Sequence, residues 1–169
     1  MQIATLEPGV LTADKGTFVR LRKLGVRYLV RGEQTGGRFS VVEHPLPPRS
    51  MGAPVHTHSR EDEITYVAEG IVGVQIGDRV YEAGPGATIF KPRGIPHAFW
   101  TATDLPARVS EIITPAGFEC YFTEMAEALV AGEGGQPDQV RVKAIQDRYG
   151  LTMDQGSIPA LAQRYGLLP

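Results

Sequence analysis

The chain has 169 residues, enough for one domain with a sizeable core but short for two. Its 17 basic and 19 acidic residues give a net charge of −2, and neither sign forms a long block. This balance provides no patch for nucleic-acid phosphates, and no apolar stretch approaches the ~20 residues of a membrane span. We therefore expect no nucleic-acid or membrane partner. The single cysteine, Cys120, cannot form an intramolecular disulfide, so a cytoplasmic location is expected.

Residues 1–114 have the pattern of an antiparallel β-protein. Short runs rich in Val, Ile, Thr, Tyr and Phe alternate there with glycine and proline, and no helical segment intervenes. Two strands are predicted within residues 18–45, a loop over the proline-rich stretch 45–54, and further short strands from His56 onwards. Gly77 and Asp78, between two alternating segments, predict a two-residue hairpin. With about eight or nine strands, the expected fold class is all-β, an antiparallel jelly-roll barrel.

Residues 115–169 have a different pattern, which predicts helices that pack on the barrel and form no independent domain. Thr114 is expected to cap a first helix with Pro115 in its first turn, because apolar residues at helical spacing follow. A flexible joint is predicted over residues 131–137. The C-terminal part is therefore expected to be a helical extension.

Two more helices are predicted over residues 138–149 and 158–165, the second with Ser157 as its cap. Both end in the sequence Arg-Tyr-Gly-Leu, which is typical of helix ends capped by glycine, here Gly150 and Gly166. A helix-turn-helix that reads DNA is the alternative for this pair. Four basic and four acidic residues in 132–169 do not favour it, because they give no positive face for phosphates.

The residues that point to chemistry lie in the stretch HTHSREDE, residues 56–63. His56 and His58 are two positions apart, so on a strand both imidazoles point to the same side. Glu63 follows after a short turn, and His97 begins another predicted strand 34 residues later. Three imidazoles and one carboxylate suit a divalent first-row ion, Fe, Mn, Ni, Co, Cu or Zn, and leave coordination positions open. The alternative is a set of polar residues at a barrel mouth that bind one another and no metal.

The spacing of these residues resembles the two signature motifs of the cupin superfamily. The first motif is matched by His56, His58, Glu63 and Gly70, and the second by Gly86, Pro92, Gly94 and His97. Gly52 stands four residues before His56 where six is usual, and Thr101 replaces the final asparagine. The resemblance covers residues 40–114 and implies a jelly-roll cupin barrel. It also implies the metal ligands His56, His58, Glu63 and His97.

Alternation along the strands gives a candidate substrate pocket. Thr65 and Val67 share the side of Glu63, while Phe99 and Thr101 share the side of His97. We expect these four residues to line a mostly apolar cavity, with ordinary core packing as the alternative. The opposite parity places Tyr66 and Trp100 on the outside, under the C-terminal helices or a partner subunit.

Three polar residues near these motifs are expected to have no metal-binding role. Glu61 and Asp62 are assigned to a solvated turn. A minority alternative makes Glu61 a hydrogen-bond partner of an imidazole, and another makes Asp62 the ligand in place of Glu63. His44 precedes the proline-rich stretch without a partner at ligand spacing, so it is expected to be a loop or surface histidine.

Among cupins, a lone barrel with a helical tail is most similar to the bacterial quercetin 2,3-dioxygenase-like proteins. That resemblance implies a metal-dependent dioxygenase that uses dioxygen on a small enolic, flavonol-like or diketone-like substrate, with Glu63 as both ligand and general base. It also implies a homodimer, for which strands before residue 45 offer a free edge. The alternatives are a metal-dependent isomerase and a small-molecule-binding protein without catalysis, because cupins with these ligands include all of these classes.

Overall fold

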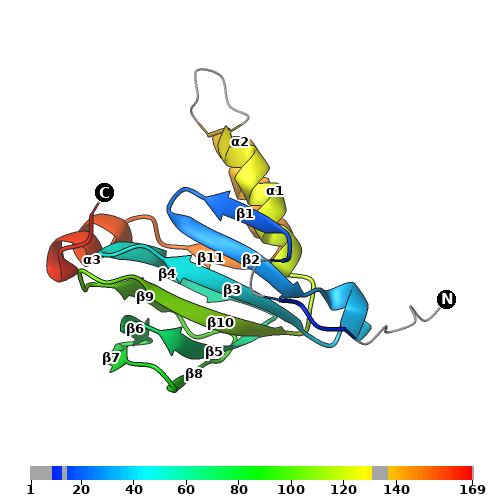
Figure 1. The fold of residues 1–169 in the computed structure, drawn as a ribbon. Coiled ribbons are helices and arrows are strands. Elements are labelled where there is room, and N and C mark those ends of the chain that lie inside the picture. Colours follow the sequence, from blue (N-terminus) through cyan, green and yellow to red (C-terminus); the bar gives the residue numbers. More distant parts are fainter. Residues whose placement is uncertain (1–8, 13–14, 131–136, 169) are drawn as a thin grey trace.

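The computed structural model describes residues 9–12, 15–130 and 137–168, which form two antiparallel β-sheets followed by helices (Figure 1). The first sheet has the strand order β1 (Phe18–Leu21), β2 (Leu24–Val30), β3 (Ser40–Leu46), β10 (Ala107–Thr114), β5 (Asp62–Glu69) and β8 (Thr88–Lys91). The second has the order β11 (Leu151–Met153), β4 (Ser50–His58), β9 (His97–Thr101), β6 (Val72–Ile76) and β7 (Arg79–Ala83). The predicted jelly-roll architecture fits this arrangement, although the strands fall into two separate sheets and not one closed barrel.

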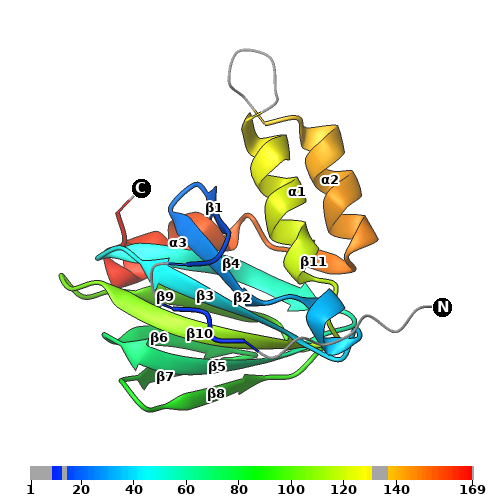
Figure 2. The same ribbon diagram turned by 45° about the vertical axis from the view of Figure 1, so that its right-hand side comes forward.

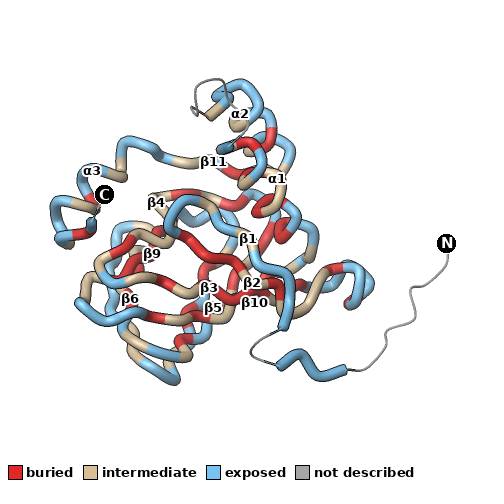
Figure 3. The backbone as a smooth tube through the Cα atoms, turned by 45° about the horizontal axis from the view of Figure 1, so that its top comes forward, coloured by how far each residue is buried: buried red, intermediate tan, exposed pale blue. Residues whose placement is uncertain are grey.

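The core lies between the two sheets. Apolar residues at alternate positions of β3, β5, β6 and β10 point into it, and Val42, Val67, Val74 and Val109 are at most 1% exposed. Figure 3 shows this alternation as buried segments along the strands. Tyr66, of opposite parity on β5, is 49% exposed, as its parity predicts. The two faces of these strands, such as β5 and β10, therefore differ as expected for sheets with one solvated side.

Several strand boundaries differ from the sequence-based expectation. Residues 18–45 contain the start of β3 as well as two strands, β1 and β2, which are joined by the turn at Arg22 and Lys23. The proposed loop 45–54 is wrong, because β4 begins at Ser50 and contains Pro54. The register between β4 and β9 shifts between Ala53 and His56, and such an irregularity allows a proline inside a strand. The hairpin at Gly77 and Asp78 is confirmed, with Ile76 opposite Arg79.

The described residues contain three α-helices after β10: α1 (Glu119–Val130), α2 (Gln139–Arg148) and α3 (Ser157–Tyr165). The short 3₁₀-helix η1 (Gly32–Thr35) lies before β3. The expected helix ends capped by glycine are confirmed for α2 and α3. Gly150 and Gly166 have φ of +64° and +62°, in the left-handed region that favours glycine. Residues 131–136 of the predicted joint lie outside the described residues. No helix in the described part of the chain is long and apolar enough to cross a membrane.

The predicted caps of the first and last helices are wrong. Thr114 is the last residue of β10, and α1 begins only at Glu119. The carboxylate of Glu119 accepts hydrogen bonds from the backbone N–H groups of Gly32 and Gly117, which secures the start of this helix. Ser157 lies inside α3 and makes no capping hydrogen bond, since its hydroxyl donates to the Asp154 carbonyl.

The helices cover different parts of the sheets. Helices α1 and α2 lie side by side at one end of the molecule, with α1 against β1 and β3 (Figure 2). Helix α3 packs on β4, and its Tyr165 stacks on Trp100 of the neighbouring strand β9 with 4.2 Å between ring centroids. Trp100 is 1% exposed, so its expected position under a C-terminal helix is confirmed. Between α2 and α3 the chain forms β11, which the expectation of helices alone missed.

Candidate metal centre

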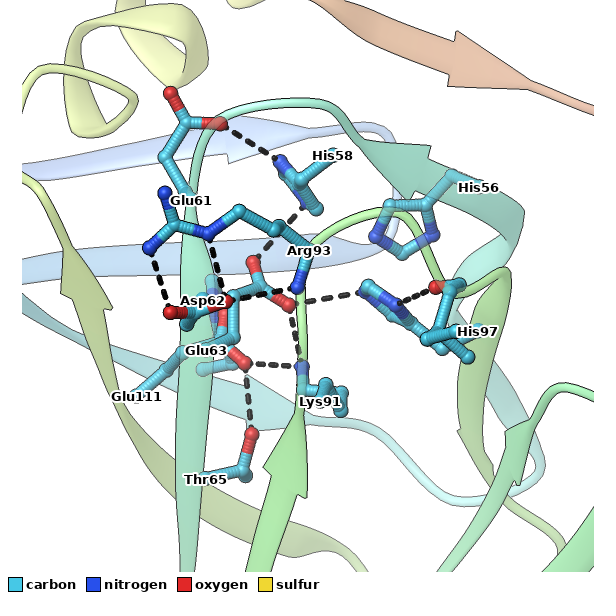
Figure 4. Close-up of polar contacts among 12 residues, drawn as sticks. His56, His58, Glu61, Asp62, Glu63, Thr65, Lys91, Arg93, His97 and Glu111 are labelled. Atoms are coloured by element: carbon cyan, nitrogen blue, oxygen red, sulfur yellow. Dashed lines mark hydrogen bonds and ion pairs between the residues drawn. The ribbon is translucent and has the colours of Figure 1, made fainter.

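The four predicted ligands converge from both sheets. His56 and His58 belong to β4, and His97 is the first residue of β9, directly opposite His56 in the strand register. Glu63 extends towards them from β5 in the other sheet. One ligand atom from each of these four residues lies within 4.8 Å of the others (Figure 4). The cluster can therefore hold a single metal ion.

These side chains are buried, and several of their polar atoms have no hydrogen-bond partner. His58, Glu63 and His97 are at most 2% exposed, and His56 is 7% exposed. His58 Nε2 lies 3.2 Å and His97 Nε2 lies 3.0 Å from oxygens of Glu63, yet neither nitrogen makes a hydrogen bond within the described residues. Because unpartnered buried polar atoms are costly, this convergence fits a divalent cation better than an empty polar cluster.

Backbone carbonyl groups orient two of the imidazoles. Nδ1 of His56 lies 2.8 Å from the carbonyl oxygen of Pro54, and Nδ1 of His97 lies 3.0 Å from that of Ile95. Each Nδ1–H can donate to this carbonyl, which leaves Nε2 with a lone pair directed at the cluster. Metal-binding histidines in proteins are commonly oriented in this way.

Glu61 has a different role from the one expected. The solvated-turn assignment is wrong, because Glu61 is 6% exposed and its Oε2 lies 3.6 Å from His58 Nδ1. Its carboxylate faces the His58 imidazole, as in the minority alternative, but at this distance the two atoms make no hydrogen bond. Asp62 instead binds Arg93 through both carboxylate oxygens, at 3.0 Å and 2.7 Å (Figure 4), and is not among the residues whose ligand atoms form the cluster. It is therefore not a ligand of the same site.

The surroundings of the cluster keep His56 neutral and Glu63 ionised, which are the states in which these side chains can bind a metal. Burial, together with the neighbouring His97 and His58, lowers the pKa of His56 to about 3, so this imidazole is neutral. Burial opposes ionisation of Glu63, but the Lys91 ammonium and His58 outweigh it and hold the pKa of Glu63 well below its usual range. Burial also opposes the charge on His58, yet Glu63 and Glu61 raise its pKa to about 9.

Lys91 and Glu111 extend the site, and the sequence analysis missed both. Lys91 is 2% exposed. Its Nζ lies 2.8 Å from Glu63 Oε2 and also forms an ion pair with Glu111 Oε1. Glu111 accepts a hydrogen bond of 2.7 Å from the Thr65 hydroxyl. Strand parity was the available signal, since Lys91 shares the parity of Ile89 and Glu111 that of Val109, both of which face the core.

His44 completes this buried network, and its expected surface position is wrong. It lies within β3 and is 1% exposed. Its Nε2 is 3.3 Å from Glu111 Oε2, and its Nδ1 is 3.0 Å from the carbonyl oxygen of Gly25. Alternating basic and acidic groups thus run from the candidate metal ligands into the core.

A cavity of about 600 Å³ opens beside the cluster, and His56, His58 and Glu63 form part of its wall. The rest of the wall is mainly apolar and includes four aromatic residues, Phe99, Phe118, Tyr121 and Phe122. Among the predicted pocket residues, Phe99 lines this cavity. Thr65, Val67 and Thr101 are buried at 4% exposure or less but do not line it.

The C-terminal extension contributes much of the cavity wall. Phe118 precedes α1, and its ring packs edge-on against His58 with centroids 4.3 Å apart. Leu151 of β11 lies opposite His58 in the strand register and also faces the cavity. The strand pattern of the sequence could not place these residues, because their contacts are with His58 of β4, which is 60 residues before Phe118 and 93 residues before Leu151.

Comparisons with known proteins agree with this geometry. A family model described as a cupin domain matches residues 43–113. The polyketide cyclase RemF from Streptomyces resistomycificus has 30% sequence identity and a TM-score of 0.57, over 64% of this chain and 80% of that one. No curated protein matches the chain significantly.

Two further solved structures share the fold at lower identity. A predicted oxalate decarboxylase from Thermotoga maritima has 18% identity and a TM-score of 0.60, over 63% of this chain and 99% of that one. The Streptomyces nucleoside dehydratase Pac13 has 13% identity and a TM-score of 0.54, over 68% of this chain and 88% of that one. The names of these proteins describe different reactions, so the shared fold does not identify the chemistry.

Proposed function

Because the chain belongs to the cupin superfamily, we propose that it is a metal-dependent enzyme that enolises and cyclises a polyketide-like or diketone-like substrate. The observation that carries this proposal is the position of Glu63. Its carboxylate lies in the wall of an apolar, aromatic-lined cavity and within reach of the three imidazoles. The same cavity wall thus combines a group that accepts protons with groups that bind metal.

The cavity has properties suited to such a substrate. Its volume of about 600 Å³ is within the range typical of small-molecule sites. Aromatic walls favour planar, conjugated molecules, and polyketide-like diketones become planar when they enolise. RemF, with 30% identity over 80% of its chain, is described as a polyketide cyclase, which supports this substrate class.

The chain's own residues have separable tasks in this reaction. His56, His58, Glu63 and His97 would hold the ion, which when bound supplies Lewis acidity to a substrate carbonyl group. Glu63, ionised because of Lys91 and His58, would accept the proton next to that carbonyl. Phe118 and Phe122 would exclude water from the enolate. Intramolecular attack of the enolate carbon on a second carbonyl would then close the ring, because the new carbon–carbon bond replaces the π bond of that carbonyl. The resulting alkoxide would take back the proton held by Glu63.

A dioxygenase acting on an enolic, flavonol-like or diketone-like substrate is the second candidate. The donor set favours it, because three imidazoles and one carboxylate suit Fe, Mn, Ni, Co and Cu and leave positions open for further ligands. Both candidates need the same first step, removal of a proton by Glu63. They differ in whether dioxygen is consumed.

The test separates the shared step from the two outcomes. Purified protein loaded with each of these ions would be given aromatic polyketide-like diketones and flavonols in deuterated buffer, with and without dioxygen. Deuterium uptake next to the carbonyl above the background rate supports enolisation. A ring-closed product formed without dioxygen supports the cyclase, and oxygen uptake coupled to product supports the dioxygenase. Tight metal retention with no reaction on any substrate contradicts both and favours a binding protein.

The variant Glu63→Gln tests the proton acceptor. Glutamine keeps the shape of the side chain and an oxygen for the ion, but it cannot accept the proton. We expect metal content to remain largely intact while turnover falls by a factor of at least ~100, the scale of a lost general base. Normal turnover by this variant would contradict the assigned role.

A further inference from the structure

We infer that Lys91 and Glu111 form a positioning pair for Glu63 that sets the affinity of the cluster for a divalent ion. Lys91 lowers this affinity and Glu111 restores it. The inference rests on the proposed metal site and assigns two residues outside the ligand set. Its basis is the arrangement of three charged side chains in the interior between the sheets (Figure 4).

The sheet register places Lys91 beside Glu63. The two residues are directly opposite each other on β8 and β5, so their side chains extend from neighbouring points on the same inner face. Lys91 Nζ lies 2.8 Å from Glu63 Oε2, and His97 Nε2 lies 3.0 Å from the same oxygen. The ammonium group therefore acts on an oxygen that also faces a metal-ligand histidine.

The position of the ammonium group is fixed from several sides. Its Nζ forms ion pairs with both Glu63 and Glu111 and lies 5.3 Å from the centroid of the Phe99 ring. The Lys91 side chain is 3% exposed, so solvent does not screen its charge effectively. A long, flexible side chain is thus held in one place next to Glu63.

Glu111 holds Lys91 and balances its charge. Its Oε1 faces Lys91 and accepts a hydrogen bond from the Thr65 hydroxyl, while its Oε2 faces His44. Residue 111 is also central in the sheet, paired with Thr65 on β5 and with Val42 on β3. The Glu111 carboxylate is therefore held in one position. From there it attracts the Lys91 ammonium and weakens the effect of that charge on Glu63.

The two residues must then have opposite effects on a cation bound by Glu63. The Lys91 ammonium competes for the electron density of the carboxylate and repels a nearby cation, so it weakens binding. Glu111 attracts both Lys91 and the cation, so it strengthens binding. A role in packing alone would give a different result, because loss of either residue would loosen the site and weaken binding.

The test measures metal affinity and not activity. Zn²⁺ alone would be titrated against a chromophoric chelator with the wild-type protein and with the variants Lys91→Met and Glu111→Gln. We expect Lys91→Met to bind Zn²⁺ about tenfold more tightly and Glu111→Gln about tenfold more weakly, the scale on which groups around metal ligands act. Weaker binding by both variants, or no change in either, would overturn the inference.

A double variant keeps the test decisive if Lys91→Met alone does not fold. Lys91→Met with Glu111→Gln removes one charge of each sign, and it should bind Zn²⁺ more tightly than Glu111→Gln alone. Equal affinity of these two proteins would contradict the role of Lys91. The matched control is the exposed pair of Arg141 on α2 and Glu127 on α1, through Arg141→Met and Glu127→Gln, which should leave Zn²⁺ affinity unchanged. Failure of the wild type itself to bind Zn²⁺ or the other ions would instead contradict the proposed function.

Discussion

His44 Nε2 lies 3.3 Å from Glu111 Oε2 in the buried interior, and the other ring nitrogen of His44 lies 3.0 Å from the Gly25 carbonyl oxygen. Replacing His44 with leucine would leave both oxygens without this partner. We expect the free energy of unfolding to fall by about 2–4 kcal/mol, the combined scale of two buried oxygen acceptors that lose a hydrogen-bond partner. Urea denaturation at neutral pH measures this loss.

The double variant His44→Leu with Glu111→Gln is the control for this prediction. Because glutamine carries no charge, its burial beside leucine costs less than burial of an unpaired carboxylate. The double variant should therefore lose less stability than the sum of the two single variants. A loss below ~0.5 kcal/mol for His44→Leu would be typical of a surface position and would contradict the buried network.

Metal binding should stabilise the fold, because the ligands converge only in the native state. An ion present at about 100 times its dissociation constant should add about 2.7 kcal/mol to the free energy of unfolding. A chelator should remove this gain. Thermal denaturation with and without Zn²⁺ measures the effect, and His97→Ala should abolish most of it by removing the ligand that β9 supplies. An equal metal-dependent shift in this variant would place the ion elsewhere.

The sequence was sufficient to predict the cluster of candidate ligands because its geometry is largely local. His56 and His58 share one face of one strand, and Glu63 follows after a single turn. The jelly-roll architecture was also accessible, since short alternating segments with glycine and proline between them are typical of it. Only His97 depended on the longer spacing between two motifs.

The residues that were missed depend on pairing between strands remote in the sequence. Lys91 meets Glu63 through the register of β5 and β8, and Glu111 meets His44 through that of β10 and β3. No local pattern fixes these registers, although strand parity shows that both charged residues point inward. Strand β11 is only three residues long and exists through its pairing with β4, so it gives no periodic signal.

Tyr165 should anchor α3 to the five-stranded sheet. Its ring stacks on Trp100 with centroids 4.2 Å apart and an interplanar angle of 26°. We expect Tyr165→Ala to lower the free energy of unfolding by about 1–2 kcal/mol, from the lost ring pair and the buried area. Tyr66→Ala is the matched control, because Tyr66 is 49% exposed on β5 and its loss should cost less than ~0.5 kcal/mol. Equal losses in urea denaturation would contradict the anchoring role.

The ion pair between Asp62 and Arg93 should give a small, acid-sensitive contribution to stability. Hydrogen bonds from the Arg93 side chain, and then from its backbone N–H, lower the pKa of Asp62 from 3.8 to about 2. Since the folded-state pKa is the lower one, the stabilisation is fully present above about pH 4 and is lost as the pH falls through about 2. The two side chains are 24% and 50% exposed, so solvent limits the contribution to about 1 kcal/mol or less. Asp62→Asn should therefore be less stable than the wild type at pH 7 by that amount in urea denaturation, and the difference should shrink on acidification. A difference that stays constant down to about pH 2 would show that the charge on Asp62 is not its source.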